Sequence, residues 1–281
     1  MQTSPTINLN FTINSGQVFL WDKIEDRWFG INGDDLLVIE EPFKIEASSK
    51  RVRRFFRHDD NLDKILAGIR RDNLVGTAVK QFSGLRLIRQ DPFQCYISFI
   101  CSSNSSIQNI KNMLVRLCQK FGNKVEFEDR QFSTFPSAER LANVTTKDLL
   151  SCGLGFRAKY VREAIKAVNL GKIEFESIRK MDYKSALETL KTVRGIGNKI
   201  ADCILLFSLD KMESFPIDRW TQRILQKYYP GIFDGMHGKS LTEKKYSSLH
   251  EKIVEHFGPY AGYSQQFLFK MERDLNKKKW L

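Results

Sequence analysis

The hydrophobic pattern of this chain changes its period once, near residue 61. Up to about residue 47, apolar residues alternate with polar ones, which is the pattern of a strand with one buried face. Beyond residue 61, apolar residues recur three and four positions apart, as on one face of a helix. The sequence therefore predicts a β-rich N-terminal part followed by a helical part.

An antiparallel sheet is predicted between residues 5 and 47. Asn14-Ser15-Gly16 interrupts the pattern, and Asn32-Gly33 is a strong signal for a hairpin turn. In the first run, Ile7, Leu9, Phe11 and Ile13 alternate with polar residues. The runs expected to form strands are residues 7–13, 18–21, 28–31 and 36–39.

Helices are predicted from residue 61 onward. Asp91 followed by Pro92 combines an N-cap residue with a proline at the first helical position. Further helices are expected after residue 106, after residue 155, over residues 185–193 and 198–209, around residues 249–257 and after residue 259. The predicted fold class is α+β, with a small antiparallel sheet domain that includes short helices over residues 1–85. A larger all-α domain follows over residues 86–281.

The charge balance favours a polyanionic partner. The chain of 281 residues has 45 Lys and Arg against 33 Asp and Glu, a net charge of +12.

The five cysteines form no Cys-x-x-Cys pair, which argues against a zinc or iron–sulfur site and favours a reducing compartment. With no apolar run of about 18 residues and no signal-like N-terminus, we expect a soluble intracellular protein without a membrane partner.

Two glycines lie between the helices predicted over residues 185–193 and 198–209. Gly195 and Gly197 permit close approach of another backbone, and the N–H groups from Asn198 onward are the unpaired donors of a helix start. This arrangement suits a DNA phosphate contacted without sequence preference. A plain turn between two helices explains the same residues equally well.

Lys199 and Asp218 are the candidate chemical groups. Lys199 opens the second helix, where burial and the helix dipole are expected to lower the pKa of its amine toward the range of a nucleophile. The alternative is a surface lysine that binds phosphate. Asp218 follows Phe215-Pro216-Ile217 and suits an N-cap, a role that also aims a carboxylate rigidly.

Together these residues resemble a known family. GIGNKIADC (195–203) followed by FPID (215–218) is similar to the helix–hairpin–helix DNA glycosylases, and the closer resemblance is to the 8-oxoguanine DNA glycosylases of the eukaryotic type. It extends over nearly the whole chain, because SGQVF (15–19), RQDPFQCYISFICSSNSSI (89–107), GLGFRAKYV (153–161) and GPYAGYSQQFLF (258–269) resemble further family segments in the same order.

The resemblance implies a bifunctional glycosylase and abasic-site lyase acting on double-stranded DNA that contains 8-oxoguanine. It would act as a monomer without metal or cofactor, in the nucleus of a eukaryote or the cytoplasm of a prokaryote. Lys199 would attack C1′ of the flipped nucleotide and Asp218 would stabilise the developing positive charge. Asn104 would fill the gap in the stack, Phe156 would wedge beside the orphaned base unless it is a core aromatic, and Arg157 would contact the opposite cytosine. The implied base pocket comprises Gly16, Phe99, Cys203, Pro216, Gln265 and Phe269.

The chain departs from the family pattern at two positions. Asn109 stands where the family has a second arginine for the opposite cytosine, so weak discrimination among opposite bases is expected. Trp220 stands where the family has a histidine. Lys277, Lys278 and Lys279 are expected to be a solvated tail. The alternatives are a helix–hairpin–helix glycosylase for other damaged purines, whose members generally lack the lysine, and a non-catalytic DNA-binding module.

Overall fold

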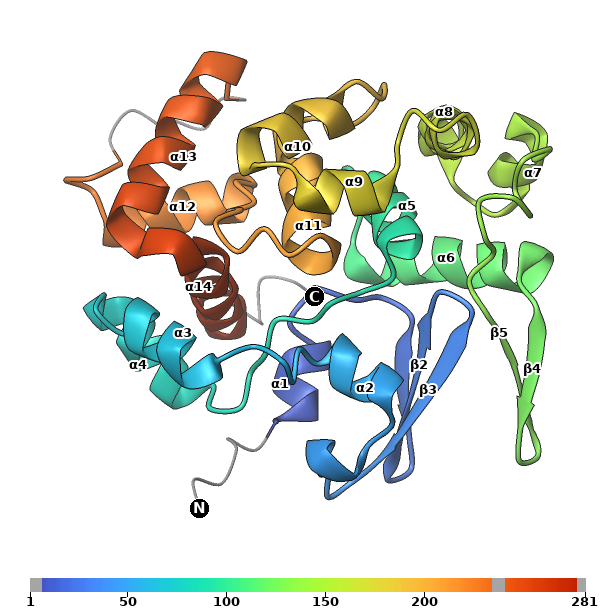
Figure 1. The fold of residues 1–281 in the computed structure, drawn as a ribbon, viewed down its shortest axis with the longest axis horizontal. Helices are drawn as coiled ribbons and strands as arrows, with labels where there is room; N and C mark the ends of the chain where they lie inside the picture. The colour runs from blue at the N-terminus through green and yellow to red at the C-terminus, as the bar shows by residue number, and fades with distance from the viewer. Residues whose placement is uncertain (1–6, 234–240, 277–281) are drawn as a thin grey trace.

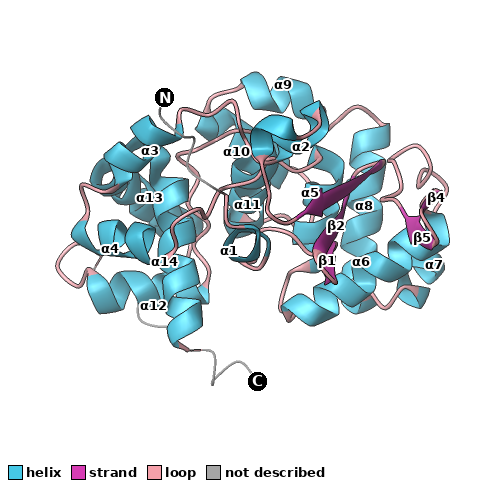
Figure 2. Ribbon diagram, turned by 90° about the horizontal axis from the view of Figure 1, so that it is seen from below, coloured by secondary structure: helices cyan, strands magenta, loops and turns pink. Residues whose placement is uncertain are grey.

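The computed structural model describes residues 7–233 and 241–276. Within these residues the chain forms helices α1 to α14 and strands β1 to β5 (Figure 1). Both sheets lie in the right-hand half of the molecule in Figure 2, and helices surround them. The lysines at 277–279 lie outside the described residues.

The predicted N-terminal sheet is confirmed as three antiparallel strands. They are β1 (Trp21–Ile24), β2 (Arg27–Asn32) and β3 (Asp35–Glu40), in the order β1-β2-β3. Asn32 pairs with Asp35, so the turn predicted at Asn32-Gly33 is a two-residue hairpin. Phe55 of helix α2 (Lys50–Phe55) packs against Trp21, with 5.2 Å between the ring centroids, and this contact attaches the helix to the sheet.

The prediction of a strand over residues 7–13 is wrong, because residues 9–13 form helix α1 (Leu9–Ile13). The side chain of Asn8 accepts the N–H of Phe11 at 2.8 Å and caps the helix. Over so short a run, apolar residues at 9 and 13 fit a helical face as well as a strand face. The prediction of a strand over residues 18–21 is also wrong except at Trp21, where β1 begins.

The helical part follows the predicted pattern. Helices α5 and α11 form its centre: residues 93–101 of α5 are all buried, and α11 packs against α5. The helices between residues 62 and 208 are α3 (Leu62–Ile69), α4 (Asn73–Gln81), α5 (Pro92–Cys101), α6 (Ile107–Phe121), α7 (Thr146–Ser151), α8 (Ala158–Asn169), α9 (Phe175–Lys180), α10 (Tyr183–Lys191) and α11 (Asn198–Ser208).

Three helices follow the α11–α12 loop: α12 (Arg219–Tyr228), α13 (Glu243–Phe257) and α14 (Ala261–Leu275). Helix α14 packs against α12 and α13 and also against α3 and α4, so it connects late and early segments of the chain. The domain boundary between residues 85 and 86 stays a prediction.

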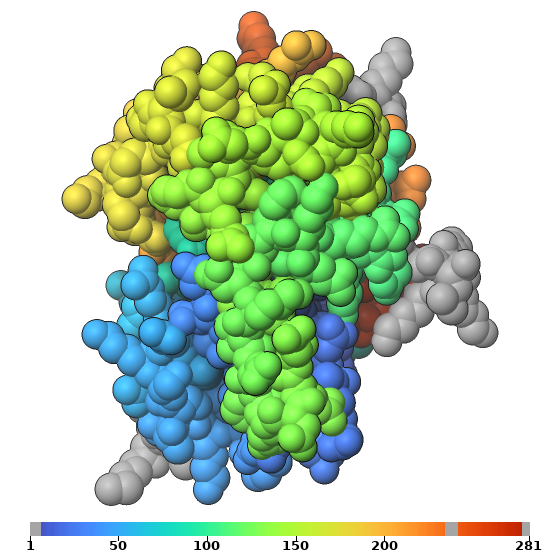
Figure 3. Space-filling model, turned by 90° about the vertical axis from the view of Figure 1, so that its right-hand side faces the viewer, coloured from blue at the N-terminus to red at the C-terminus, as the bar shows by residue number. Residues whose placement is uncertain are grey.

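A hairpin lies within the part expected to be all-helical. Strands β4 (Lys124–Phe127) and β5 (Arg130–Ser133) pair antiparallel and pack beside the N-terminal sheet (Figure 3). Phe132 stacks on Phe29 of β2 with 5.1 Å between ring centroids, and Glu128 forms an ion pair with Arg27 at 2.7 Å. The larger part is therefore mostly helical, and its hairpin fastens it to the sheet.

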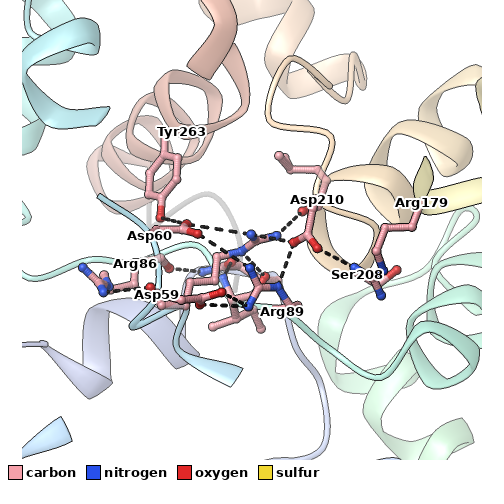
Figure 4. A network of polar contacts seen from close by, with 12 residues as sticks. Asp59, Asp60, Arg86, Arg89, Arg179, Ser208, Asp210 and Tyr263 are labelled. Atoms are coloured by element: carbon pink, nitrogen blue, oxygen red, sulfur yellow. Dashed lines mark hydrogen bonds and ion pairs between the residues drawn. The ribbon is translucent and has the colours of Figure 1, made fainter. Parts of the chain in front are cut away.

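A carboxylate at the C-terminal end of α11 joins the two parts of the chain. Asp210 is bound by Arg57 Nη1 at 2.7 Å, by Arg89 Nε at 2.8 Å and by Arg179 (Figure 4). Arg57 has no exposed surface and donates further to the carbonyls of Ile88 and Leu206, each at 3.2 Å. This ion-pair network fixes the end of α11 relative to the N-terminal part.

We expect Asp210→Asn to reduce the free energy of unfolding by about 3 kcal/mol, because Arg57 would keep a buried charge without its main counterion. Asparagine accepts the left-handed backbone of this position, where φ is +61°, so the substitution tests charge rather than conformation. Chemical denaturation measures the loss. The control is Arg51→Ala, which removes an ion pair whose arginine is 74% exposed and should cost at most about 1 kcal/mol. Equal losses would contradict the role of the network.

Candidate active site and nucleic-acid interface

A cavity of about 880 Å³ opens where helices α11 and α12 begin. It is polar at its rim and brings together segments that are far apart in sequence. Its walls are residues 102–106 after α5, Asn109 of α6, residues 197–200 of α11, residues 217–220 before and within α12, and Tyr246 of α13. Lys199, Asp218, Asn104, Gly197 and Asn198, which were singled out from the sequence, all lie here.

Lys199 is partly buried in the first turn of α11. Its Nζ lies 5.8 Å from the centre of the Phe99 ring, and its ammonium hydrogen-bonds Cys203, one turn further along the helix. Burial lowers the pKa of Lys199, but Cys203 and Asp218 raise it by more, so the net shift is upward. The downward shift expected from the sequence is therefore wrong for this structure. Burial raises the pKa of Cys203 to about 12, so at neutral pH this thiol acts on Lys199 through the hydrogen bond, and Asp218 supplies the negative charge.

Asp218 caps helix α12, as predicted. One carboxylate oxygen accepts the N–H groups of Trp220 at 2.9 Å and Thr221 at 2.8 Å. These bonds fix the carboxyl group at the positive end of the helix dipole. Its negative charge reaches Lys199, as the pKa of the lysine shows. Pro216, two residues earlier, is buried.

The glycine predicted for the base pocket is held by helix α14. The carbonyl of Ser15 accepts Gln266 Nε2 at 3.0 Å, and the carbonyl of Asn14 accepts Arg273 Nη1 at 3.2 Å. Gly16, with φ of +91°, lies against Phe269: a Cβ at Gly16 would stand 3.4 Å from that ring. The structure thus brings Gly16 and Phe269 together. Gln266 and Arg273 were missed by sequence reasoning, which has no signal for a bond across 250 residues.

Gln265 points its amide into the protein rather than into solvent. It is 6% exposed, and its Nε2 lies 3.5 Å from the hydroxyl of Thr221, in the first turn of the helix that Asp218 caps. Its Oε1 is buried without a hydrogen-bond partner. Because unpaired buried polar atoms are costly, this acceptor is available to a ligand that brings its own donor.

The loop that bears Asn104 is fixed by Arg157. Arg157 Nε donates to the carbonyl of Ser103 at 2.9 Å, and Nη2 donates to the carbonyl of Asn104 at 3.0 Å. Asn104 is exposed and has a left-handed backbone with φ of +51°. Phe156 is 54% exposed, with the Arg157 guanidinium 4.4 Å from its ring centre, so it is not a core aromatic.

The turn between α10 and α11 has one glycine that the fold requires and one that it does not. A Cβ at Gly195, where φ is +98°, would stand 2.6 Å from the Tyr160 ring. Gly197 has an extended backbone and open space around its Cα, which leaves room for an approaching group. Beside it, Asn198 Oδ1 is buried without a partner.

Two kinds of feature are absent from residues 7–233 and 241–276. No group of three or more His, Cys, Asp or Glu side chains is placed to hold a metal ion. No helix in these ranges combines the length and apolar character needed to cross a membrane.

Comparison with known proteins identifies the family. The model described as HhH-GPD superfamily base excision DNA repair protein matches residues 97–252, and the model described as 8-oxoguanine DNA glycosylase, N-terminal domain, matches residues 1–96. The chain therefore belongs to the HhH-GPD superfamily of base excision DNA repair proteins and, within it, to the 8-oxoguanine DNA glycosylases.

Relatives and solved structures agree with this assignment. The chain is 29% identical to the N-glycosylase/DNA lyase OGG1 of Arabidopsis thaliana over 98% of this chain and 80% of the relative. It is 30% identical to the N-glycosylase/DNA lyase of Saccharomyces cerevisiae over 84% of this chain and 72% of the relative. The Clostridium acetobutylicum 8-oxoguanine glycosylase/lyase, solved with double-stranded DNA containing cytosine opposite 8-oxoG, superimposes with a TM-score of 0.86. That match has 28% identity and covers 97% of this chain and 93% of that chain.

We expect Gly195→Ala to lower the free energy of unfolding by about 1–3 kcal/mol, because the added Cβ meets Tyr160 and the left-handed backbone is strained. Gly197→Ala is the matched control and should change stability by less than about 1 kcal/mol. Thermal or chemical denaturation measures both. Similar losses at the two glycines would show that the turn is limited by something other than contact with Tyr160.

Proposed function

We propose that this protein is a bifunctional DNA glycosylase and abasic-site lyase that excises 8-oxoguanine from double-stranded DNA. The observation that carries the proposal is the convergence of Lys199 and Asp218 in one cavity, at the starts of α11 and α12. The names of the relatives from Arabidopsis and yeast include both activities, and the Clostridium structure includes the lesion.

The chemistry assigns one role to each side chain. The neutral amine of Lys199 attacks C1′, the N-glycosidic bond breaks, and the base leaves with its bonding electrons and takes up a proton. The carboxylate of Asp218 stabilises the positive charge on the sugar during this step. The sugar ring opens to an imine on Lys199, loss of a proton from C2′ expels the 3′ phosphate, and water hydrolyses the imine to free the lysine.

The charge of Lys199 limits the first step. An ordinary lysine, with a pKa of about 10.4, is neutral in roughly one molecule in 2,500 at pH 7. The upward shift of the Lys199 pKa reduces that fraction further. A flipped nucleotide would exclude water and separate the amine from Cys203, and both changes act on this pKa.

The pocket residues support recognition of the oxidised base. In this proposal the Gly16 carbonyl accepts the N7–H that 8-oxoguanine has and guanine lacks. Gln265 binds the Watson–Crick edge, and its unpartnered Oε1 is the acceptor that such an edge would satisfy. Cys203 and Phe269 would enclose the two faces of the base, with Phe99 beneath Lys199.

The remaining residues would hold the duplex open. Asn104, on the loop fixed by Arg157, would fill the gap left by the flipped nucleotide, and the exposed Phe156 would wedge beside the orphaned base. Gly195, Gly197 and Asn198 would bind a phosphate through backbone N–H groups. Asn109 lies on the cavity wall, exposed, where an arginine would give a stronger contact to cytosine, so discrimination among opposite bases is expected to be weak.

We expect borohydride to trap wild-type protein on a duplex that contains one 8-oxoguanine, and Lys199→Gln to abolish trapping because no amine remains to form the imine. Lys184→Gln, at an exposed position of α10, is the control and should trap normally.

The trapping rate of the wild-type protein should rise with pH, by up to about tenfold per unit between pH 6 and 8, since only the neutral amine attacks. Trapping that survives Lys199→Gln, or a rate independent of pH, would exclude Lys199 as the nucleophile.

We expect Gln265→Ala to weaken binding of lesion-containing DNA by about tenfold, because a buried hydrogen bond to the base is lost. Cleavage at a pre-formed abasic site should change little, since that substrate has no base to bind. Affinity and abasic-site cleavage are measured on the same preparation. Equal losses on both substrates would show that Gln265 supports the fold rather than the base.

A further inference from the structure

A carboxylate that no described step uses is buried one turn after Lys199. Asp202 of α11 has no exposed surface and accepts hydrogen bonds from two tyrosines on different helices. Tyr183 of α10 donates to Oδ1 at 2.8 Å, and Tyr246 of α13 donates to Oδ2. The group therefore ties three helices together at the floor of the cavity that Tyr246 lines.

Tyr246 extends this group to the segment that carries Asp218. Its hydroxyl oxygen accepts the N–H of Ile217 at 3.2 Å. Because the single hydroxyl proton goes to Asp202, the lone pair of the oxygen must face Ile217. The amide is buried, since Ile217 is 3% exposed, so the hydroxyl is the partner that keeps this donor satisfied.

Burial of Asp202 is unfavourable for its ionised form. Burial raises the pKa of Asp202 to about 7, the tyrosine hydrogen bonds and Ser214 lower it, and the nearby charge of Glu213 raises it. Tyr183 is itself held in place by His250, whose ring stacks on it with 4.2 Å between centroids.

We propose that Asp202 and Tyr246 are positioning residues that set Asp218 relative to Lys199. Asp202 lies on the same helix as Lys199, three residues further along. The hydroxyl of Tyr246 bonds both Asp202 and the backbone N–H of Ile217, the residue before Asp218. This inference rests on the proposed roles of Lys199 and Asp218. It adds a chain of hydrogen bonds that links the helix of Lys199 to the segment of Asp218.

Two tyrosines on the same carboxylate give a matched pair of variants. Tyr246→Phe removes both the bond to Asp202 and the acceptor for Ile217, whereas Tyr183→Phe removes only a bond to Asp202. We expect Tyr246→Phe to lower the single-turnover excision rate by about tenfold, since small misplacements of reacting groups are costly. Affinity for lesion DNA should stay within about threefold of wild type. Tyr183→Phe should lower the excision rate by less than about threefold.

Hydrogen exchange gives a readout that does not depend on activity. In Tyr246→Phe the Ile217 amide should exchange at least about tenfold faster than in wild type, and in Tyr183→Phe it should be unchanged. Equal rate losses in the two variants, an unchanged excision rate in Tyr246→Phe, or unchanged exchange at Ile217 would overturn the positioning role. A wild-type protein that does not excise 8-oxoguanine would instead refute the proposed function, and the exchange result would still decide whether Tyr246 fixes the segment.

Discussion

The ion pairs of Asp210 with three arginines are the contact on which the placement of the cavity depends. Arg57 comes from the N-terminal part and Arg89 lies four residues beyond the predicted boundary, whereas Asp210 lies two residues after the end of α11. Helix α11 carries Lys199 at its other end, so the network sets the direction in which the amine is presented. The Gly16 loop belongs to the N-terminal part as well, so this ion-pair network relates the proposed nucleophile to the proposed base pocket.

The helix dipole has opposite effects on the two side chains proposed to react. Asp218 lies at the start of α12, where the dipole and two N–H donors favour its negative charge. Lys199 lies at the start of α11, where the dipole opposes a positive charge. Asp218 and Cys203 offset that opposition in this structure and keep the amine protonated. Under the proposed function, a substrate that separates these groups would therefore change the reactivity of the lysine.

The sequence predicted those elements whose signal is local. The α5 cap at Asp91-Pro92, the β2–β3 hairpin and the two helices around Gly195 and Gly197 all depend on neighbouring residues, and all are present. Short segments were less predictable: residues 9–13 fit both periods, and the β4–β5 hairpin is stabilised by the distant Phe29 and Arg27.

Residue types and their order pointed to Lys199 and Asp218, the family resemblance pointed to Asn104, and all three lie on one cavity. The direction of the lysine pKa was not predictable, because it depends on how closely Cys203 and Asp218 approach the amine. The Asp202 cluster was hidden for a similar reason. An aspartate inside an apolar helix has no pattern of its own, and its tyrosine partners lie 19 and 44 residues away.

The bonds from Gln266 and Arg273 to residues 14 and 15 have a consequence for how the molecule is made. The loop at Gly16, proposed to contact the damaged base, emerges early in synthesis, but the helix that holds it is translated about 250 residues later. Contacts of such long range form slowly and late in folding. The proposed base pocket is therefore completed only after the turn at Gly195 and Gly197 has been synthesised, because helix α14 follows that turn in the chain.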